Sequence, residues 1–258
     1  MPPTATYLYC VVKAAAKPAV PAAIAGLPGA SRPTVVPLER SLWLVVAEVP
    51  LDRYGHEALE SSLRDLQWVG RAAVAHESVV ESFAARRGAT IVPMKLFTMF
   101  SSTERAIVEM KSRRREIAAV MKRITGCEEW GVRLMRNAGQ AQRRVMDDRG
   151  PSGTAFLAAK KRVRDESRLA AAAAAGAAED VFTALAALAR AATRRSDAPD
   201  GVATPPLLDA AFLVPTARRA LFRSAVKRLA RTSAKAGADV TLTGPWPAYN
   251  FIAAGSQV

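Results

Sequence analysis

The chain has 258 residues, 50% of them hydrophobic, and a formal net charge of +14 at pH 7. A chain of this length can bury a substantial core and favours two domains over one. Because the N-terminus lacks the charged-then-apolar layout of a signal peptide, and the only long apolar stretch is a weakly hydrophobic alanine tract, we expect a cytoplasmic protein without a membrane span.

The cysteines and the distribution of charge indicate the cellular compartment and the kind of partner. Cys10 and Cys127 are far apart and form no pair motif, so we expect free thiols in a reducing compartment. Residues 1–100 hold 10 basic and 8 acidic side chains, whereas residues 101–258 hold 27 and 15. This basic second half is compatible with a nucleic-acid partner and, more simply, with solvated helix faces, because net charge alone specifies no partner.

The first half predicts the elements of an α+β domain. Residues 6–12 and 42–49 are apolar runs rich in β-branched and aromatic side chains, which is typical of central strands. A helix is predicted to begin near Asp65, and its helical spacing places His76 on the apolar face. Residues 89–96 predict a further strand, near an edge or a bulge because the strand contains a proline.

The end of the first domain is predicted from a helix signal. Apolar residues recur at helical spacing from Ser102 to about Thr125, and Gly126 follows, where a glycine can end a helix in the left-handed conformation. We therefore predict one continuous helix here and a first domain of residues 1–125.

The second half, residues 126–258, predicts an α+β domain of the ferredoxin-like kind with a long helical region and an aromatic C-terminal segment. The long helix should overhang an ordinary sheet, since each residue adds about 1.5 Å. The predicted elements, in chain order, are a strand at 129–135, a helix at 150–195, a strand at 210–214, a helix after Pro215 and a strand at 239–243.

The C-terminal sequence is the most informative stretch of the chain. Residues 243–251 read Thr-Gly-Pro-Trp-Pro-Ala-Tyr-Asn-Phe, with two prolines that fix φ and three aromatic side chains. A terminus this stiff and this apolar is expected to dock onto a surface rather than to fray. Trp246 lies in a turn-like segment, where an aromatic side chain serves either internal packing or protein recognition.

Motifs for catalysis, metal binding and cofactor binding are incomplete. His76-Glu77 could begin a zinc-protease helix, but the second histidine would fall at position 80, which is Val80. The only other histidine is His56, and no cysteine pair is present, so we expect no metal site. No glycine-rich phosphate loop occurs, so we expect no cofactor. We interpret His76 as a neutral core histidine and expect that the protein is not an enzyme.

Five blocks of sequence, taken in order and at their spacing, carry a family resemblance. The blocks are Tyr7 to Val12, Leu66 to Val80, Ile91 to Phe100, Cys127 to Val132 and Leu242 to Phe251. Together they resemble the gas vesicle proteins of the GvpL/GvpF family, and the Gly-Pro-Trp-Pro ending is the most specific of them. Phe97 departs from the family pattern, because the resemblance implies a glycine there. A bulky residue adopts positive φ only at a cost, so we expect a reshaped turn.

The resemblance implies a fold and a function. It implies two α+β domains, one of them a modified ferredoxin fold, which agrees with the elements predicted above. It also implies a non-enzymatic accessory protein for the assembly of gas vesicles, the gas-filled protein shells that give cells buoyancy. The implied partners are the hydrophobic shell subunit GvpA and other gas vesicle accessory proteins, with the protein associated with gas vesicles in the cytoplasm.

Two surfaces are predicted to make these protein contacts. One is the aromatic C-terminal segment and the other is the basic face of the helix that follows Pro215. The predicted contact residues are Trp246, Tyr249, Phe251, Arg219, Arg223 and Lys227.

Two alternative functions remain open from the sequence. A nucleic-acid-binding protein would use the basic helices of the second half, although these helices lack the interleaved aromatic residues of single-strand binders. Such a protein would lose affinity steeply as salt rises. An enzyme would use His76 and Glu77, and in that case the substitution His76→Gln would leave the fold intact while abolishing turnover.

Overall fold

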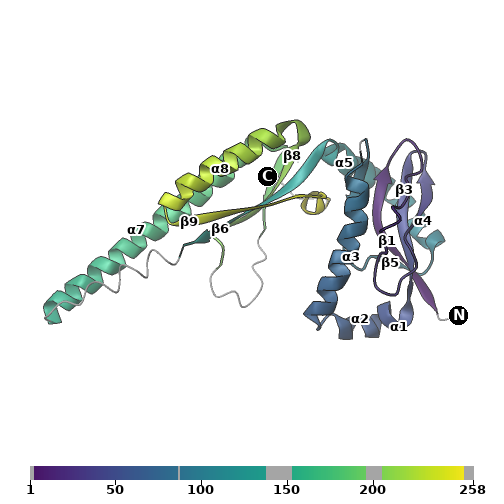
Figure 1. Ribbon diagram of the computed structural model, residues 1–258, viewed down its shortest axis with the longest axis horizontal. Coiled ribbons are helices and arrows are strands. Elements are labelled where there is room, and N and C mark those ends of the chain that lie inside the picture. Colours follow the sequence, from purple (N-terminus) through teal and green to yellow (C-terminus); the bar gives the residue numbers. More distant parts are fainter. Residues whose placement is uncertain (1–2, 87, 138–152, 196–204, 253–258) are drawn as a thin grey trace. The chain divides into compact units, whose positions relative to one another are not determined.

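The computed structural model describes residues 3–86, 88–137, 153–195 and 205–252, and for residues 153–159 the helical backbone only (Figure 1). The chain divides into two compact units. The first unit comprises the chain up to Gly126 together with residues 246–252 near the C-terminus, and the second begins at Cys127 and ends at Pro245. The chain therefore passes from one unit to the other twice.

This division differs from the predicted one mainly at the C-terminus. The boundary at Gly126 lies one residue beyond the predicted end of the first domain, but the aromatic C-terminal segment, predicted with the second domain, belongs to the first unit. The reason is non-local packing: Tyr249 packs against the core of the first unit, which a reading of local sequence cannot foresee.

An antiparallel sheet of five strands forms the centre of the first unit. Its order is β2-β3-β1-β4, and β5 also pairs with β1. Eight consecutive residues of β1, from Ala5 to Val12, are buried, so both faces of this strand are covered, as its apolar sequence predicts. The strands are β1 (Thr4–Lys13), β2 (Thr34–Glu39), β3 (Leu42–Pro50), β4 (Thr90–Pro93) and β5 (Met99–Phe100).

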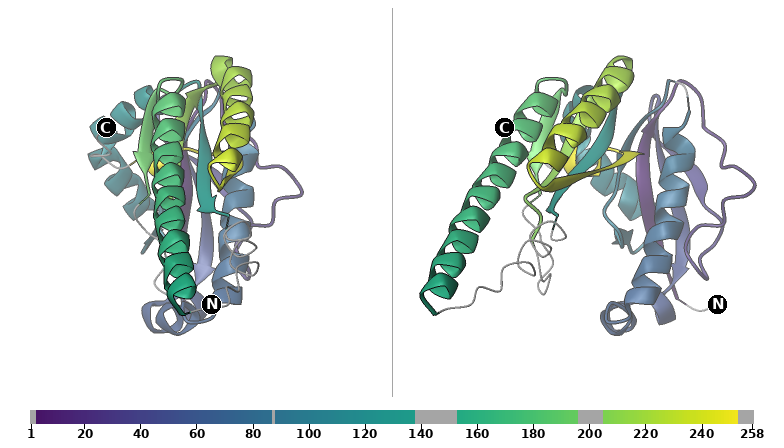
Figure 2. Two further views of the ribbon diagram at one scale, coloured as in Figure 1. Left: turned by 90° about the vertical axis from the view of Figure 1, so that its left-hand side faces the viewer. Right: turned by 60° about the vertical axis from the view of Figure 1, so that its left-hand side comes forward.

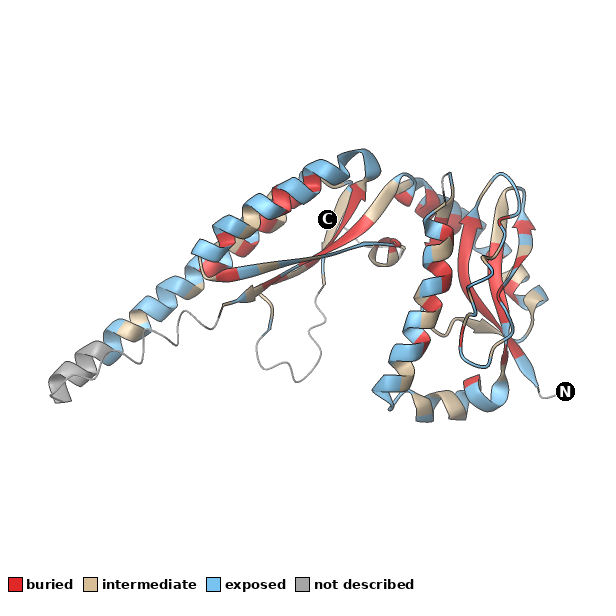
Figure 3. Cartoon of the chain, viewed as in Figure 1, coloured by how far each residue is buried: buried red, intermediate tan, exposed pale blue. Residues whose placement is uncertain are grey.

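Most helices of the first unit pack against this sheet. The Asp65 side chain caps α3 by accepting hydrogen bonds from the backbone N–H groups of Gln67 and Trp68, at 2.9 and 3.2 Å. Buried residues follow the inner side of α3 and the strands it covers (Figure 3). The helices are α1 (Leu51–Tyr54), α2 (His56–Ser62), α3 (Leu66–Ala84), α4 (Thr103–Ser112) and α5 (Arg114–Ile124).

The helix predicted from Ser102 to Thr125 is two helices. α4 ends and α5 begins at Arg113, whose backbone leaves the helical region at φ −90° and ψ 12°. The Arg113 guanidinium then forms two hydrogen bonds of 2.9 Å with the carboxylate of Glu116 in the first turn of α5. The prediction of one continuous helix was wrong because both pieces share the same apolar period, which does not reveal a short break.

The second unit has the ferredoxin-like arrangement. Its sheet order, β7-β8-β6-β9, is that of a β-α-β-β-α-β fold, with β6 and β7 each antiparallel to β8. Its elements are β6 (Cys127–Arg136), α7 (Gly153–Ala186), β7 (Ala191–Arg194), β8 (Leu208–Pro215), the 3-10 turn η1 (Thr216–Arg218), α8 (Arg219–Lys235) and β9 (Ala238–Trp246), and the 3-10 turn η2 (Tyr249–Phe251) follows in the first unit.

The predicted helix at 150–195 ends earlier than expected. α7 stops at Ala186, and Ala191–Arg194 forms β7, which pairs with β8 from Ala191 opposite Leu213 to Arg194 opposite Ala210. Alanine-rich sequence favours helix locally, so only the pairing with β8 identifies this short strand.

The two helices of the second unit lie side by side on one face of its sheet (Figure 2). A single core joins them to alternate residues of β6 and β8, including Trp130, Val132 and Phe212. α7 is long: its 34 residues correspond to about 50 Å, and it continues beyond the sheet as predicted (Figure 1).

Among the residues that the structure describes, one helix has the length and composition to cross a membrane, over Lys160–Ala186 within α7. Its apolar character comes mainly from alanine. Ala174, Ala178, Val181 and Leu185 are buried against the ferredoxin-like sheet, which is the packing of a helix in a globular domain. The preceding residues, 160–173, are exposed or half-buried.

Candidate functional site

The C-terminal segment, residues 246–252, follows a glycine-proline pair in the last residues of β9. Gly244 has a φ of 110°, a conformation open to glycine, and the Gly244–Pro245 peptide bond is cis. Beyond it, Pro247, Ala248 and Phe251 are buried in the first unit. The segment is therefore docked, as its sequence predicts.

Tyr249 and Phe251 both contact residues of the first unit. Arg123 of α5 donates a hydrogen bond of 2.6 Å from its guanidinium to the backbone carbonyl of Phe251. The Phe251 side chain is 1% exposed. The Tyr249 ring lies 6.3 Å from the His76 ring, centroid to centroid. These two predicted contact residues therefore pack within the protein.

Tyr249 also faces the carboxylate of Glu77 on α3. Burial and then the neighbouring Glu77 carboxylate raise the pKa of the Tyr249 hydroxyl well above its ordinary value. Burial likewise raises the pKa of Glu77, while the nearby Tyr249 hydroxyl lowers it. The phenol therefore stays protonated at neutral pH, as a neutral group beside the Glu77 carboxylate.

His76 lies at the centre of a buried aromatic cluster. Its side chain is 3% exposed, its ring stacks on Tyr9 at 5.6 Å, and its Nδ1 lies 2.7 Å from the Tyr7 hydroxyl. The backbone N–H of Phe97 donates to the same hydroxyl oxygen at 3.2 Å, so the Tyr7 O–H is free to donate to Nδ1.

The electrostatics of this cluster favour uncharged forms. Burial lowers the pKa of His76 to about 4, opposed by the backbone of Met94. Burial also raises the pKa of Tyr7 far above its ordinary value. His76 is thus neutral and hydrogen-bonded at pH 7, which confirms the interpretation of a core histidine.

Trp246 differs from its neighbours in the segment. Its side chain remains 41% exposed, although it adjoins the buried Pro247 and Ala248. An indole held at the surface by a rigid, docked segment is pre-organised to contact a partner at little cost in conformational entropy. Of the three predicted aromatic contact residues, Trp246 alone is exposed, whereas Tyr249 is half-buried and Phe251 is buried.

The basic face of α8 forms a regular series that we call the cationic row. Its members recur at every fourth position and are all exposed. They are Arg219, Arg223, Lys227, Arg231 and Lys235. The opposite side of the helix buries Phe222, Ala225 and Val226 in the core of the second unit. Leu221, although apolar, is 56% exposed.

The first member of the cationic row has a partner within its own unit. The Arg219 guanidinium forms a bidentate ion pair with the Glu128 carboxylate of β6, in which Nε lies 2.9 Å from Oε2. Arg219 therefore ties the start of α8 to the sheet. Among the residues that the structure describes, Arg223 and Lys227 form no such pair.

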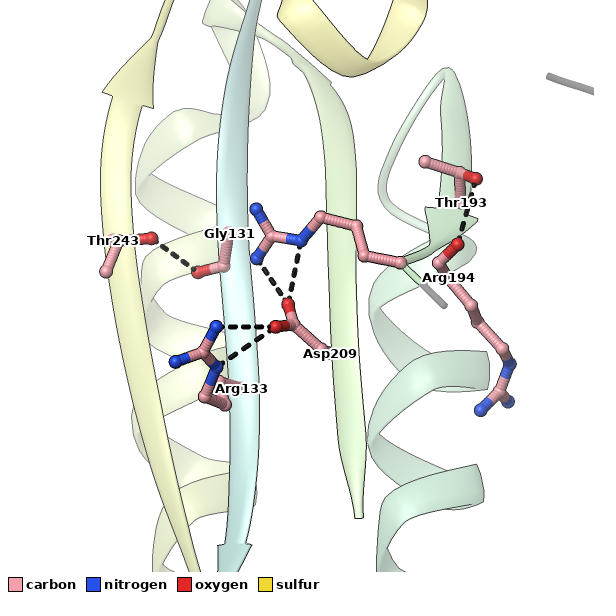
Figure 4. Close-up of polar contacts among 7 residues, drawn as sticks. Gly131, Arg133, Thr193, Arg194, Asp209 and Thr243 are labelled. Atoms are coloured by element: carbon pink, nitrogen blue, oxygen red, sulfur yellow. Dashed lines mark hydrogen bonds and ion pairs between the residues drawn. The ribbon is translucent and has the colours of Figure 1, made fainter. Parts of the chain in front are cut away.

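A cluster of one aspartate and two arginines, which the sequence analysis did not predict, lies on the sheet of the second unit (Figure 4). Asp209 of β8 binds two guanidinium groups: Arg133 donates to Oδ2 at 2.7 and 3.0 Å, and Arg195 Nε donates to Oδ1 at 2.7 Å. The register of β6 and β8 places Arg133 opposite Asp209, so a correct strand alignment could have revealed the Arg133–Asp209 pair but not the contact of Arg195.

Gly131 permits this arrangement. A side chain there would place its Cβ 2.5 Å from the Thr243 hydroxyl and 3.2 Å from the Arg195 guanidinium. The glycine within the Glu-Glu-Trp-Gly-Val block thus leaves room for close packing between β6 and the side chains of Thr243 and Arg195. In the described part of the chain, no group of three His, Cys, Asp or Glu residues is placed to hold a metal ion.

The similarity of this chain to known proteins extends over both units. Residues 5–253 match the family model described as gas vesicle synthesis protein GvpL/GvpF. The chain belongs to the GvpL/GvpF family. A relative named gas vesicle protein L, from Streptomyces sp. (strain CB03234), is 29% identical over 217 residues, which cover 80% of this chain and 78% of the relative.

Solved structures of GvpF proteins have the same fold. The crystal structure of GvpF from Anabaena sp. PCC7120 matches with a TM-score of 0.64 at 15% identity, covering 98% of this chain and 97% of that one. GvpF from Microcystis aeruginosa gives a TM-score of 0.60 at 12% identity, with 97% and 99% covered. At these identities the likeness shows the fold, two α+β units, and the family match supplies the link to gas vesicles.

Phe97 lies at the position where the resemblance to the GvpL/GvpF family implies a glycine. We expected a reshaped turn that avoids a positive φ at this residue. That expectation was wrong, because Phe97 itself adopts a positive φ of 63°. Its ring stacks on Trp68 with centroids 5.5 Å apart and planes inclined by 15°, and its N–H donates to Tyr7. These contacts offset the strain of a left-handed conformation, which is roughly 1–2 kcal/mol for a non-glycine residue.

Proposed function

We propose that this protein is a non-enzymatic accessory factor for gas vesicle assembly that binds the hydrophobic shell subunit GvpA, other accessory proteins, or both, while the shell forms. The observation that carries the proposal is the family match over residues 5–253, which spans both units rather than one. The physical need is clear: a shell subunit with an apolar face would associate through exposed strands unless it is held before addition.

The chemistry of the buried groups supports a binding role over catalysis. His76, the most perturbed histidine, has its Nδ1 engaged by Tyr7 and is 3% exposed, so a substrate has no access to it. A general base must reach the proton that it removes, and His76 is enclosed by aromatic rings instead.

Trp246 is the residue that we propose as the anchor for the shell subunit. It combines an exposed indole with a docked, proline-stiffened backbone. Aromatic anchors of this kind dominate many protein interfaces because they bury a large area while losing few rotamers. Tyr249 and Phe251 then act indirectly, by holding Trp246 in place.

Co-purification tests this proposal. Tagged protein is co-expressed with a gas vesicle shell subunit and washed from low to high salt in the presence of nuclease. We expect the wild type to retain the subunit through high salt, because apolar burial is not screened. Trp246→Ala should lose most of the retained subunit while the melting temperature changes little.

A matched control comes from the same unit. Leu66 is 83% exposed, so Leu66→Ala removes a comparable exposed apolar side chain away from the C-terminal segment. The proposal for Trp246 is contradicted if both variants retain the subunit equally, or if Trp246→Ala unfolds. Loss of the wild-type interaction, with nucleic acid co-purifying before nuclease treatment, would favour a nucleic-acid-binding protein instead.

A further inference from the structure

The cationic row of α8 is unusual in the balance of its charges. The helix, Arg219–Lys235, contains six lysine and arginine residues and no aspartate or glutamate. Like charges four residues apart face each other on a helix and repel, and the first turn carries Arg219 where the helix dipole favours an acid. The row therefore opposes the stability of its own helix.

Intramolecular contacts explain only the first position of the row. Arg219 is bound by Glu128, as described above. Among the residues that the structure describes, Arg223, Lys227 and Arg231 take part in no ion pair, and all three are exposed. Packing does not require them either, since α8 buries its opposite side in the core.

The geometry of the three central cations suits one kind of ligand. Consecutive members are separated by about 6 Å along the helix and turn by about 40°, so the three lie within an arc of about 80°. Carboxylates four residues apart on a second helix have the same separation, which allows the two rows to face each other pair by pair.

The residues around the row favour a protein partner. Ala220, Ser224 and Ala234 lie on the same exposed side of α8, and small side chains let a second helix approach closely. No aromatic side chain is exposed on α8, whereas single-stranded nucleic acids are bound by stacking on such rings.

We propose that Arg223, Lys227 and Arg231 bind an acidic helical segment of a partner protein, one with carboxylates at four-residue spacing. These residues differ from Trp246 and would give the protein a salt-sensitive contact in addition to an apolar one. In assigning the segment to a gas vesicle component, the proposal rests on the proposed function. The binding itself can be measured without any vesicle protein.

Two synthetic peptides test the spacing. The first is an alanine-based helix with glutamate at every fourth position, and the second has the same composition with the glutamates distributed around the helix. Fluorescence anisotropy with the full-length protein at low and physiological salt gives both affinities. We expect the first peptide to bind about tenfold more tightly, because only it can pair with all three cations at once.

A charge-reversed variant tests the location. Arg223→Glu, Lys227→Glu and Arg231→Glu together should weaken binding of the first peptide by roughly 10- to 100-fold, since three attractive contacts become repulsive. The neutral triple variant, with glutamine at these positions, should lose less affinity for the first peptide than the charge-reversed variant does. It should also fold at least as well as the wild type. Circular dichroism and melting temperatures verify the fold of both.

The control variant carries the same change in net charge elsewhere. Arg64, Arg71 and Arg115 are exposed residues of the first unit and form no ion pair among the described residues. Their reversal to glutamate should leave the affinity for the first peptide within about twofold, because none of the three belongs to the proposed binding row.

Three results would overturn the proposal: equal affinity for the two peptides, equal loss in the control variant, or tighter binding of a short nucleic-acid strand than of the first peptide. These outcomes are distinct from failure of the proposed function. That function fails when wild-type protein does not retain the shell subunit in co-purification, whatever the peptides do.

Discussion

The C-terminal segment and the cationic row of α8 are both conspicuous in sequence, but the protein uses them differently. Tyr249 and Phe251 of the segment find their partners inside the first unit, on α3 and α5. Arg223 and Lys227 of the row are exposed and, among the described residues, without an ion-pair partner. A distinctive motif can thus serve mainly to hold the fold, whereas charge that the fold does not use is the better guide to a partner.

Trp246 shares one property with the docked segment and one with the exposed cationic row. It belongs to the docked segment, yet it keeps 41% of its surface exposed. The comparison therefore predicts that substitutions within one short segment will separate into those that unfold the protein and one that removes a contact.

The largest expected effect is at Phe251. Because its side chain is 1% exposed, Phe251→Ala should lower the free energy of unfolding by about 3–5 kcal/mol through lost burial and the cavity left behind. Urea denaturation followed by circular dichroism measures it. If Phe251→Ala is as stable as Trp246→Ala, the segment does not hold the fold.

Acid should weaken the cluster beneath the segment. The pKa of His76 is lowered to about 4 by burial, from 6.5 in an unfolded chain, so the unfolded state binds a proton that the folded state excludes. Stability is therefore full above pH 6.5 and falls as the pH drops toward 4, by about 2 kcal/mol at pH 5. Chemical denaturation at a series of pH values measures this loss.

The variant His76→Gln isolates the histidine in that experiment. It retains Glu77, whose raised pKa acts in the opposite direction because the folded state then binds a proton more readily. The decline between pH 6.5 and 5 should disappear in the variant. An unchanged decline would assign the acid sensitivity to other groups.

The strained turn at Phe97 yields a smaller and more specific effect. Phe97→Ala removes the ring from Trp68 but leaves a β-carbon at a φ of 63°, whereas Phe97→Gly removes both the ring and the strain. Both variants should be less stable than the wild type, with Phe97→Gly the more stable of the two by about 1 kcal/mol. Thermal melts of the pair test this order, and the reverse order would contradict a strained Phe97.

Neutralising the cationic row should have the smallest effect on stability. Replacing Arg223, Lys227 and Arg231 with glutamine removes repulsion between neighbours and no described ion pair. The free energy of unfolding should change by less than about 0.5 kcal/mol, and in the stabilising direction. A loss of more than about 1 kcal/mol in urea would mean that these cations serve the fold after all.

Sequence patterns predicted most of the framework because the responsible signals are local. The apolar run of β1, the capping Asp65 of α3 and the two-faced pattern of α8 each act within one element. The ferredoxin-like unit followed from the order of its elements, and the neutral state of His76 followed from its place on the apolar face of α3.

The remaining features depend on contacts between distant residues. β7 is a strand only because it pairs with β8, and its alanines favour helix when taken alone. Tyr249 meets His76 across more than 170 positions of sequence, and Arg195 reaches Asp209 from beyond the end of β7. Phe97 keeps its left-handed turn because Trp68 and Tyr7 support it, which the identity of residue 97 does not reveal.

Gas vesicle formation in cells tests the central claim most directly. A host carrying a complete set of gas vesicle genes except the one for this protein is complemented with the wild-type chain, and vesicles are counted by electron microscopy. We predict few or no vesicles and an aggregated shell subunit without the chain, and restored vesicles with it. Equal numbers of vesicles with and without the chain, and a shell subunit that stays soluble in both, would contradict its role as an assembly factor.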